Sequence, residues 1–335
     1  MITFLSEVLV DLIKKDLKLS DLTFIVPSRR ASVILKHELS ILTNKTIFSP
    51  EIVSIETFTE KLSQLKPISN TELLFQFYET YTKLTPKEER DSFETFSKWA
   101  QILLQDFNEI DRYLIPQEKI FNYLSAIQDL KHWSLEENKT DFVKNYLSFW
   151  NKLNSIYSHF TEQLLEREVG YQGLIYREAV EHIESYIQNN ETKKHVFVGF
   201  NALNSAEEII IQELLGNGLA EIYWDIDSQF FNNKHHDAGL FIRQYKTNWR
   251  FYNSNSFNWI SNYYTHEKQI ESYAIPKNIG QVKQIGSILK LLLDDGESLE
   301  KTAVILADED LLIPVLNSLP HGLENVNITM GLPLK

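Results

Sequence analysis

No glycine precedes Gly170 in this chain of 335 residues, and none of its 11 glycines is followed by lysine. A phosphate-binding loop needs glycines so that the backbone can wrap the phosphates, and then Lys and Ser or Thr to reach the terminal phosphate and its Mg²⁺. The sequence therefore excludes a phosphate-loop ATPase of the ordinary kind. We expect a chain that binds no nucleotide cofactor and acts without catalysis.

The composition predicts a globular protein, with 43% hydrophobic and 24% charged residues, long enough for two or three domains. No stretch approaches the roughly 20 apolar residues that span a bilayer, and the N-terminal segment lacks the basic head and cleavage site of a leader peptide. The absence of cysteine excludes disulfides, thiolate metal sites and cysteine nucleophiles, and agrees with a reducing compartment. We therefore predict a cytoplasmic protein with no membrane partner.

The formal net charge is −13, from 33 Lys and Arg against 46 Asp and Glu. Such a balance opposes the non-specific attraction to phosphate on which free-standing nucleic-acid binders usually rely. Any contact with DNA must therefore be local.

The order of predicted elements indicates an α/β fold. Short apolar runs alternate with segments of helical periodicity over residues 1–66 and again over 191–265, as in strand–turn–helix units. One such helix is expected from Arg30 to Leu42, and another from Phe58 to Leu65 with Thr57 as its cap. The strands expected here are Leu22–Val26, Glu51–Ile55, His195–Val198 and Ala220–Trp224.

Residues 67–190 lack β-branched runs and instead carry an aromatic side chain at every third or fourth position over long stretches. This pattern predicts an all-helical domain inserted into the α/β domain, with its longest helix over Asp141–Glu168. Residues 266–335 are predicted to begin a second α/β domain, within which the sequence breaks off. We expect a strand over Gln269–Ile275 that leads into a helix over Gly280–Leu293, and then a strand over Thr302–Leu306 and a helix over Leu311–Ser318. Asn327–Met330 is expected to begin another unit.

Four segments in this order resemble a known family: TFIVPSRRASVILKHEL, SPEIVSIETFTEKL, HVFVGFNALNSAEEIIIQELL with AEIYWDIDSQFF, and TAVILADEDLLIPVLNSLP with NITMGLPL. They resemble the N-terminal part of the AddB-like proteins, in which an inactivated superfamily I helicase region precedes a PD-(D/E)XK nuclease domain. The resemblance implies a helicase-like (RecA-like) parallel-sheet core. It also implies that the full-length protein is a nuclease whose nuclease domain lies outside this sequence.

By this resemblance, Ser28, Arg29 and Arg30 occupy the strand-end loop that touches single-stranded DNA in active motors. Two arginines at a helix start could pair with phosphates, whereas the alternative is a solvated pair beside acidic neighbours. Ser54–Phe58 resembles the next DNA-contacting segment of active motors. There Thr57 could bond phosphate and Phe58 could stack on a base. Packing in the core is the favoured alternative for Phe58.

The same resemblance identifies remnants of a nucleotide site. Gly199 and Phe200 stand where an active motor has the Asp-Glu pair that holds Mg²⁺. Asp225 and Gln229 resemble the motif that couples nucleotide to DNA in active motors. We interpret these two residues as an inactive remnant of that motif. Glu207 and Glu208, a few residues downstream, are interpreted as surface residues rather than displaced ligands.

Three further groups of polar residues have simpler explanations than catalysis. His235, His236 and Asp237 are adjacent on one loop, which is typical of a polar loop, so we predict no metal site. The acidic groups Asp106/Glu109/Asp111 and Asp308/Glu309/Asp310 lack the following Glu-x-Lys of a PD-(D/E)XK site. Asp310 is expected to cap a helix.

These features predict a non-catalytic scaffold that positions DNA ends, or a separated strand, for the nuclease in bacterial double-strand break repair and recombination. The expected partners are DNA and a helicase–nuclease subunit. The alternative is a scaffold that docks such a subunit without touching DNA. An ATPase with an unorthodox site is a third, disfavoured hypothesis.

Overall fold

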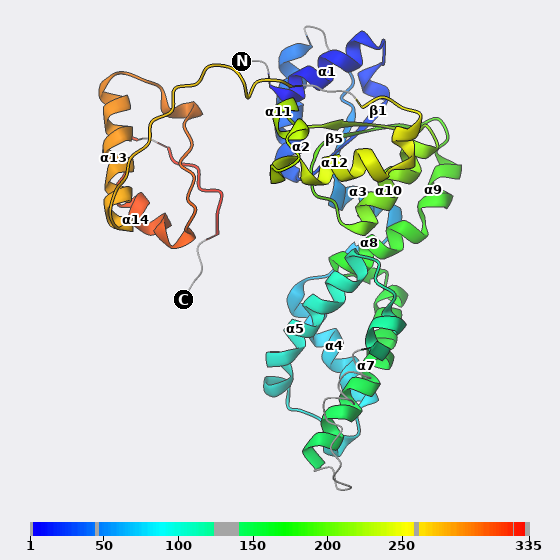
Figure 1. The fold of residues 1–335 in the computed structure, drawn as a ribbon. Coiled ribbons are helices and arrows are strands. Elements are labelled where there is room, and N and C mark those ends of the chain that lie inside the picture. Colours follow the sequence, from blue (N-terminus) through cyan, green and yellow to red (C-terminus); the bar gives the residue numbers. More distant parts are fainter. Residues whose placement is uncertain (1–2, 44–46, 124–140, 258–260, 324, 332–335) are drawn as a thin grey trace. The chain divides into compact units, whose positions relative to one another are not determined.

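The computed structural model describes residues 3–43, 47–123, 141–257, 261–323 and 325–331, with the side chains of the helix that begins at Asp141 described from Lys152 onward. The chain divides into two compact units, Met1–Thr265 and His266–Lys335. The first unit combines an α/β core with a helical segment (Figure 1). Each unit is described by itself.

The core of the first unit is a sheet of four parallel strands in the order β2-β1-β5-β6. All five residues of the central strand β1 are buried, as expected for a parallel strand covered on both faces. The sheet confirms the α/β prediction, and two of its strands match the predicted bounds. The strands are β1 (Leu22–Val26), β2 (Glu51–Ser54), β5 (Lys194–Phe200) and β6 (Ala220–Trp224).

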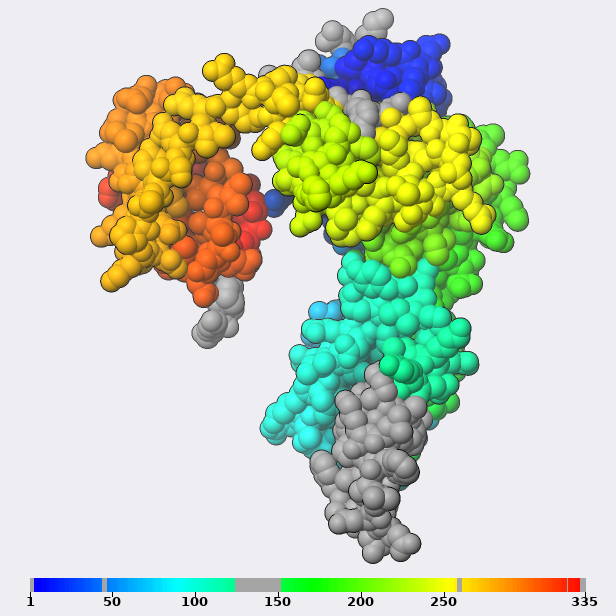
Figure 2. All heavy atoms as spheres, viewed as in Figure 1, coloured from blue at the N-terminus to red at the C-terminus, as the bar shows by residue number. Residues whose placement is uncertain are grey.

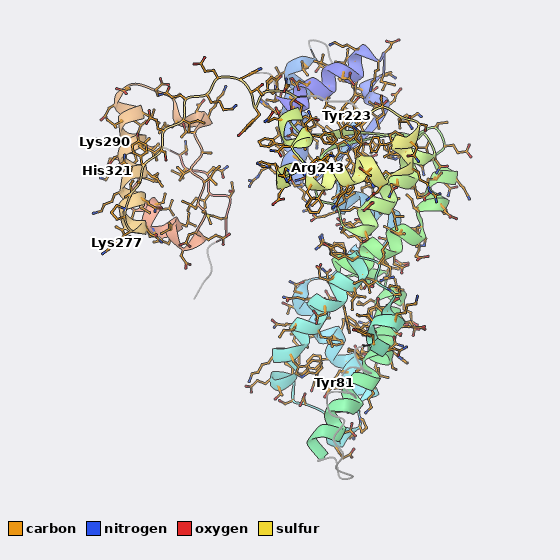
Figure 3. All side chains as sticks on the ribbon, in the orientation of Figure 1. Tyr81, Tyr223, Arg243, Lys277, Lys290 and His321 are labelled. Atoms are coloured by element: carbon orange, nitrogen blue, oxygen red, sulfur yellow. The ribbon has the colours of Figure 1, made fainter. Side chains whose placement is uncertain are left out.

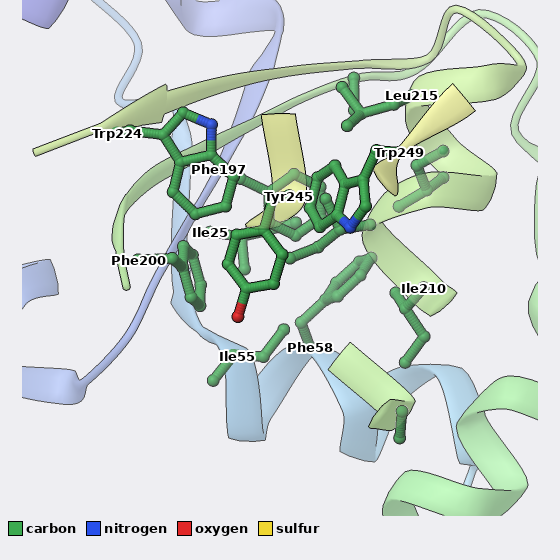
Figure 4. Packing of buried hydrophobic residues seen from close by; sticks show 14 of the residues in the cluster. Ile25, Ile55, Phe58, Phe197, Phe200, Ile210, Leu215, Trp224, Tyr245 and Trp249 are labelled. Carbon is green, nitrogen blue, oxygen red and sulfur yellow. The ribbon is translucent and has the colours of Figure 1, made fainter. Parts of the chain in front are cut away.

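Helices cover both faces of this sheet. Phe24 and Val26 of β1 belong to the hydrophobic cluster that includes α1 (Phe4–Lys14) and α2 (Arg29–Leu42). Ile25 points to the opposite face, because side chains alternate along a strand. There it joins a second cluster with α3 (Ile55–Ser63), α10 (Ser205–Gly216) and α12 (Leu240–Asn248), part of which Figure 4 shows.

The helical segment follows β2 and α3 in the chain and has a hydrophobic core of its own, rich in aromatic rings. Phe77 is fully buried there, with ring centroids 4.9 Å from Phe160 and 5.8 Å from Phe107. Helix α8 lies where this segment meets the α/β core, and residues 67–123 of the segment form the cyan surface in Figure 2. Its elements are β3 (Lys66–Pro67), α4 (Asn70–Leu84), α5 (Phe93–Arg112), α7 (Asp141–Glu166), β4 (Val169–Gly170), α8 (Gln172–Glu181) and α9 (Ile183–Asn189).

Asp111 joins three of these helices although its side chain is fully buried. It accepts hydrogen bonds from the hydroxyls of Tyr157, at 2.5 Å, and Tyr171. Arg177 Nε lies 2.6 Å from Asp111 Oδ1 and completes the set with an ion pair. Burial, followed by the charge of Asp111, raises the pKa of both tyrosines, so their hydroxyls remain donors. Asp111 is thus a structural hub joining α5, α7 and α8.

Residues 225–257 contain helices that the sequence did not predict, because the segment is polar and its apolar residues have no clear period. The helices are anchored by aromatic rings: Trp249 is 1% exposed and donates from Nε1 to Glu208 Oε1 at 2.8 Å. Arg243, labelled in Figure 3 with Tyr81 of α4 and Tyr223 of β6, donates to the carbonyl of Phe230 at 2.8 Å. Besides α12 the elements are α11 (Ser228–Asn232) and the 3-10 turns η3 (Asp237–Gly239) and η4 (Arg250–Asn253).

The second unit contains α13 (Asn278–Asp294) and α14 (Leu312–Leu316), which pack together. The strands expected at Gln269–Ile275 and Thr302–Leu306 are wrong: these segments have no strand pairing, and Ile270 and Ile305 are 81% and 90% exposed. A strand needs a ladder partner, and no described residue of this unit supplies one. The other 3-10 turns among the described residues are η1 (Leu19–Asp21), η2 (Lys87–Glu89), η5 (Leu299–Lys301) and η6 (Glu309–Leu311).

Within the described ranges, no helix is long and apolar enough to cross a membrane.

Candidate nucleic-acid interface

The carboxyl ends of β1 and β2 are side by side, with Val26 in register with Ser54. Helices α2 and α3 start directly after these ends, so two helix N-termini come from neighbouring strands. The next neighbour of β1 is β5, which makes the β1–β5 boundary the point where the strand order reverses. Ligands of open α/β sheets bind at this edge. The candidate site is therefore the loop Pro27–Arg30 and the strand ends around it.

Ser28 caps α2: its hydroxyl accepts a hydrogen bond from the backbone N–H of Ala31 at 3.2 Å. The backbone N–H groups of Arg29 and Arg30 lie in the first turn, where a helix has no internal acceptors. Both arginine side chains are exposed, and no described residue forms an ion pair or a hydrogen bond with either guanidinium. Two cations, a hydroxyl and free N–H groups therefore lie together at a helix start, where anions are favoured.

Thr57 does not cap a helix, in contrast to the prediction. Helix α3 begins at Ile55, three residues before the predicted start, and Ser54 is its cap. The backbone N–H of Thr57 donates to Ser54 Oγ at 3.3 Å, and the two hydroxyl oxygens are 3.2 Å apart. The half-buried Thr57 hydroxyl thus lies one strand away from Ser28 but is already engaged with Ser54.

Phe58 is 2% exposed and cannot present a face to a base. Its ring meets those of Tyr186 and Phe197 edge to face, with centroids 5.8 Å and 6.3 Å away. Figure 4 shows Phe58 and Phe197 in this cluster. The stacking hypothesis for Phe58 is therefore wrong, and the packing alternative describes it.

The predicted nucleotide-site remnants lie on β5 or follow β6, the two strands on the side of β1 away from β2. Gly199 has a φ of +77° and forms a bulge between Val198 and Phe200, and Phe200 is buried at 4% exposure. Phe200 pairs with Trp224, so Asp225 follows at the adjacent strand end. Gln229 lies in α11, where its side chain is exposed and its backbone N–H donates to Asp227 Oδ1 at 2.8 Å.

Asp225 has a perturbed carboxylate. Desolvation by the surrounding protein, followed by the nearby charge of Glu7, raises the pKa of Asp225. Glu7 accepts a hydrogen bond from the hydroxyl of Tyr263. Like-charged neighbours near the strand end make this half of the edge unfavourable for phosphate.

Glu207 and Glu208 are not free surface residues, which corrects the interpretation made from sequence. Glu207 forms a capping box with Asn204 at the start of α10 and accepts a hydrogen bond from Tyr176 Oη at 3.0 Å. Burial raises the pKa of Glu207. Glu208 accepts the Trp249 indole N–H, so both carboxylates hold structure together.

A groove of about 900 Å³ opens beside Arg29, between α3, α4, α5 and α8. Its charged lining consists of Arg29 and three carboxylates, Glu56, Glu60 and Glu109. Amide side chains such as Gln101 and Gln105 line it as well, and neither Glu56 nor Glu60 has a cationic partner among the described residues. The groove thus repels phosphate, while the outer side of the α2 start attracts it.

The other polar clusters have structural roles. Among the described residues no group of three or more His, Cys, Asp or Glu could hold a metal ion. His236 Nδ1 accepts the Ala238 N–H at 3.1 Å and so caps a 3-10 turn. Asp308, not Asp310, is the cap of η6, since Asp308 Oδ1 accepts the Asp310 N–H at 3.1 Å.

No family model matches the chain, and no curated protein matches it significantly.

Proposed function

We propose that this chain is a non-catalytic, helicase-like scaffold that positions DNA ends or a separated strand for a PD-(D/E)XK nuclease domain in double-strand break repair and recombination. The observation that carries the proposal is the unpaired Arg29–Arg30 couple beside the Ser28 cap at the carboxyl edge of the sheet. The parallel sheet with a long helical segment between β2 and β5 is compatible with the helicase-like core that the sequence resemblance implies.

The chemistry of this site suits phosphate. Arginine presents a planar fork of donors to phosphate oxygens, and the first turn of α2 adds backbone N–H groups. Because the groove beside Arg29 is lined by Glu56, Glu60 and Glu109, a strand would run along the outer side of the α2 start. Two neutralised phosphates on a single strand give a slope of about −1.4 for the logarithm of affinity against that of salt concentration.

No step of this function requires ATP. The end of β5 presents Val198, Gly199 and Phe200, none of which can coordinate Mg²⁺ or polarise a water molecule. DNA is held and oriented, and the chemistry belongs to the nuclease domain and to a helicase–nuclease partner subunit. A cytoplasmic location follows from the same proposal.

The test is binding of a labelled duplex with a single-stranded tail, measured by fluorescence anisotropy at two salt concentrations. The variant is Arg29→Ala/Arg30→Ala, and the matched control removes two other exposed cations, Lys234→Ala/Arg250→Ala. Salt-dependent binding that weakens at least about tenfold only in the first variant supports the proposal. Equal loss in both variants, or none in either, contradicts a defined site.

The acidic groove favours a second candidate, a scaffold that docks the helicase–nuclease subunit without touching DNA. Three carboxylates beside one arginine suit a basic protein segment better than a nucleic acid. The same titration separates the two functions, because the docking scaffold predicts no binding of the tailed duplex even at low salt.

A further inference from the structure

Helix α2 carries two apolar stripes on opposite faces. Its buried residues are Ser32, Leu35 and Leu39, which face the sheet. At about 100° per residue, a second stripe lies on the opposite side of the helix. Its members are Val33, Ile34, His37 and Ile41, all exposed.

The outer stripe is unusually apolar for a solvent-facing helix surface. Val33, Ile34 and Ile41 are 66%, 46% and 60% exposed. A helix at the surface of a globular domain is normally polar on the side away from the core, and a helix apolar on two faces is normally covered on both. The stripe therefore has the character of a surface that another element covers.

An apolar hollow lies beyond the C-terminal end of α2. It has a volume of about 440 Å³, and its lining includes Ile13, Leu19 and Thr43. Ile47 and Phe48 form another part of its wall, and the Phe48 ring is 90% exposed. A hollow of this kind accepts one bulky apolar side chain, as anchor pockets in protein interfaces do.

The charges beside the stripe are positive, in a chain whose net charge is −13. Arg29 and Lys36 lie on one flank and Arg30 at the head of the stripe. None of the three forms an ion pair with a described residue. The one carboxylate of the helix, Glu38, lies on the other side and is half-buried.

We infer that the outer face of α2 is a docking surface for an amphipathic helix of a partner protein, one with an apolar stripe, acidic residues along its flank and a bulky apolar side chain for the hollow. Charge complementarity selects this occupant. The 14 residues of α2 extend over about 21 Å, which matches a partner helix of about four turns.

The probe is a labelled helical peptide of about four to five turns with Leu at one face, one Phe at an end and Glu along the flank. Two comparison peptides replace every Glu by Lys or every apolar residue by Ser. The full chain is expected to bind the Glu peptide at least about tenfold more tightly than either comparison peptide. Val33→Ser/Ile41→Ser should remove this binding, whereas Ile102→Ser/Ile209→Ser, at exposed positions of α5 and α10, should not.

A charge exchange tests the selectivity. Lys36→Glu should weaken binding of the Glu peptide and strengthen that of the Lys peptide. Failure of the Glu peptide to bind, or equal binding to the Val33→Ser/Ile41→Ser variant, overturns the inference. Sedimentation that shows a dimer lost in that variant would overturn it in favour of a second copy of the chain.

The apolar stripe is separate from the proposed DNA contact, although the two surfaces share Arg29 and Arg30. The Val33→Ser/Ile41→Ser variant should bind the tailed duplex as the unchanged chain does. Lys36→Glu adds negative charge near Arg29 and is therefore judged by peptide binding alone. DNA binding that survives while peptide binding is absent would overturn the docking surface only, and the reverse result would contradict the DNA proposal only.

Discussion

His195 is buried at 1% exposure, yet both of its ring nitrogens have partners. Nδ1 lies 3.1 Å from the carbonyl oxygen of Leu219, and Nε2 lies 2.8 Å from Tyr186 Oη. A carbonyl can only accept, so Nδ1 carries the proton and the Tyr186 hydroxyl donates to Nε2. Burial lowers the pKa of His195 below its usual 6.5.

Acidification should therefore destabilise the first unit through His195. Below pH 6.5, His195 binds a proton in the unfolded chain but stays neutral in the folded protein until the pH falls further. The free energy of unfolding therefore decreases as the pH falls. His195→Gln should reduce the slope of the urea midpoint between about pH 7.5 and about pH 5.5. His235→Gln, at an exposed loop, is the control. An unchanged slope in His195→Gln would show that other groups cause the acid sensitivity.

Sequence patterns predicted the identity of several site residues but not their local roles. The strand–turn–helix pattern placed Ser28, Arg29 and Arg30 together at a helix start, where they lie. It could not separate Ser54 from Thr57 as the cap of α3, because both are hydroxyl residues within one turn. The burial of Phe58 depends on rings from Tyr186 and Phe197, more than 120 residues away in the chain.

At the scale of elements, β1 was predictable because burial on both faces left an almost continuous apolar run. The bounds of β1 and β6 match those expected from sequence. The segments Gln269–Ile275 and Thr302–Leu306 also carry apolar residues in a strand-like pattern, but strand identity depends on a neighbouring strand as well. In α2, two stripes of apolar residues on opposite faces both have a helical period. The sequence alone therefore does not determine which stripe packs on the sheet.

Helices α5 and α8 approach each other at Gly173. A Cβ atom added there would lie 2.2 Å from the backbone oxygen of Asn108, whose side chain also accepts the Gly173 N–H at 2.7 Å. Gly173→Ala should therefore push the helices apart and destabilise the protein by about 1–3 kcal/mol. Gly216→Ala, where no atom lies within 4 Å, should be neutral or slightly stabilising. Thermal denaturation of both variants checks this, and equal midpoints would contradict the close packing.

At the scale of the whole molecule, the three hydrophobic clusters all lie within the first unit. The last of their residues come from the segment after α12, where Trp249 packs at 5.7 Å from Trp224 and 5.0 Å from Tyr245. Ser261 bridges to Asp227, and the backbone N–H of Tyr264 donates to Asp227 Oδ2 at 2.8 Å. The folding of the first unit should thus need the chain up to Thr265 and nothing after it.

A fragment of residues 1–265 should therefore fold alone, with the main thermal transition of the full chain, because it keeps every residue of the three clusters. A fragment of residues 1–248 should fail to fold or melt at a much lower temperature, because it leaves the site of the buried Trp249 ring empty and Glu208 without its indole donor. Circular dichroism melts of the two fragments and the full chain provide the comparison. A 1–265 fragment that is unfolded would show that residues 266–335 contribute to the core. A stable 1–248 fragment would place the C-terminal boundary of the first folding unit before Trp249.

Because Arg29, Arg30 and the outer stripe of α2 all lie in the first unit, the 1–265 fragment should also bind the tailed duplex and the Glu peptide with the affinities of the full chain.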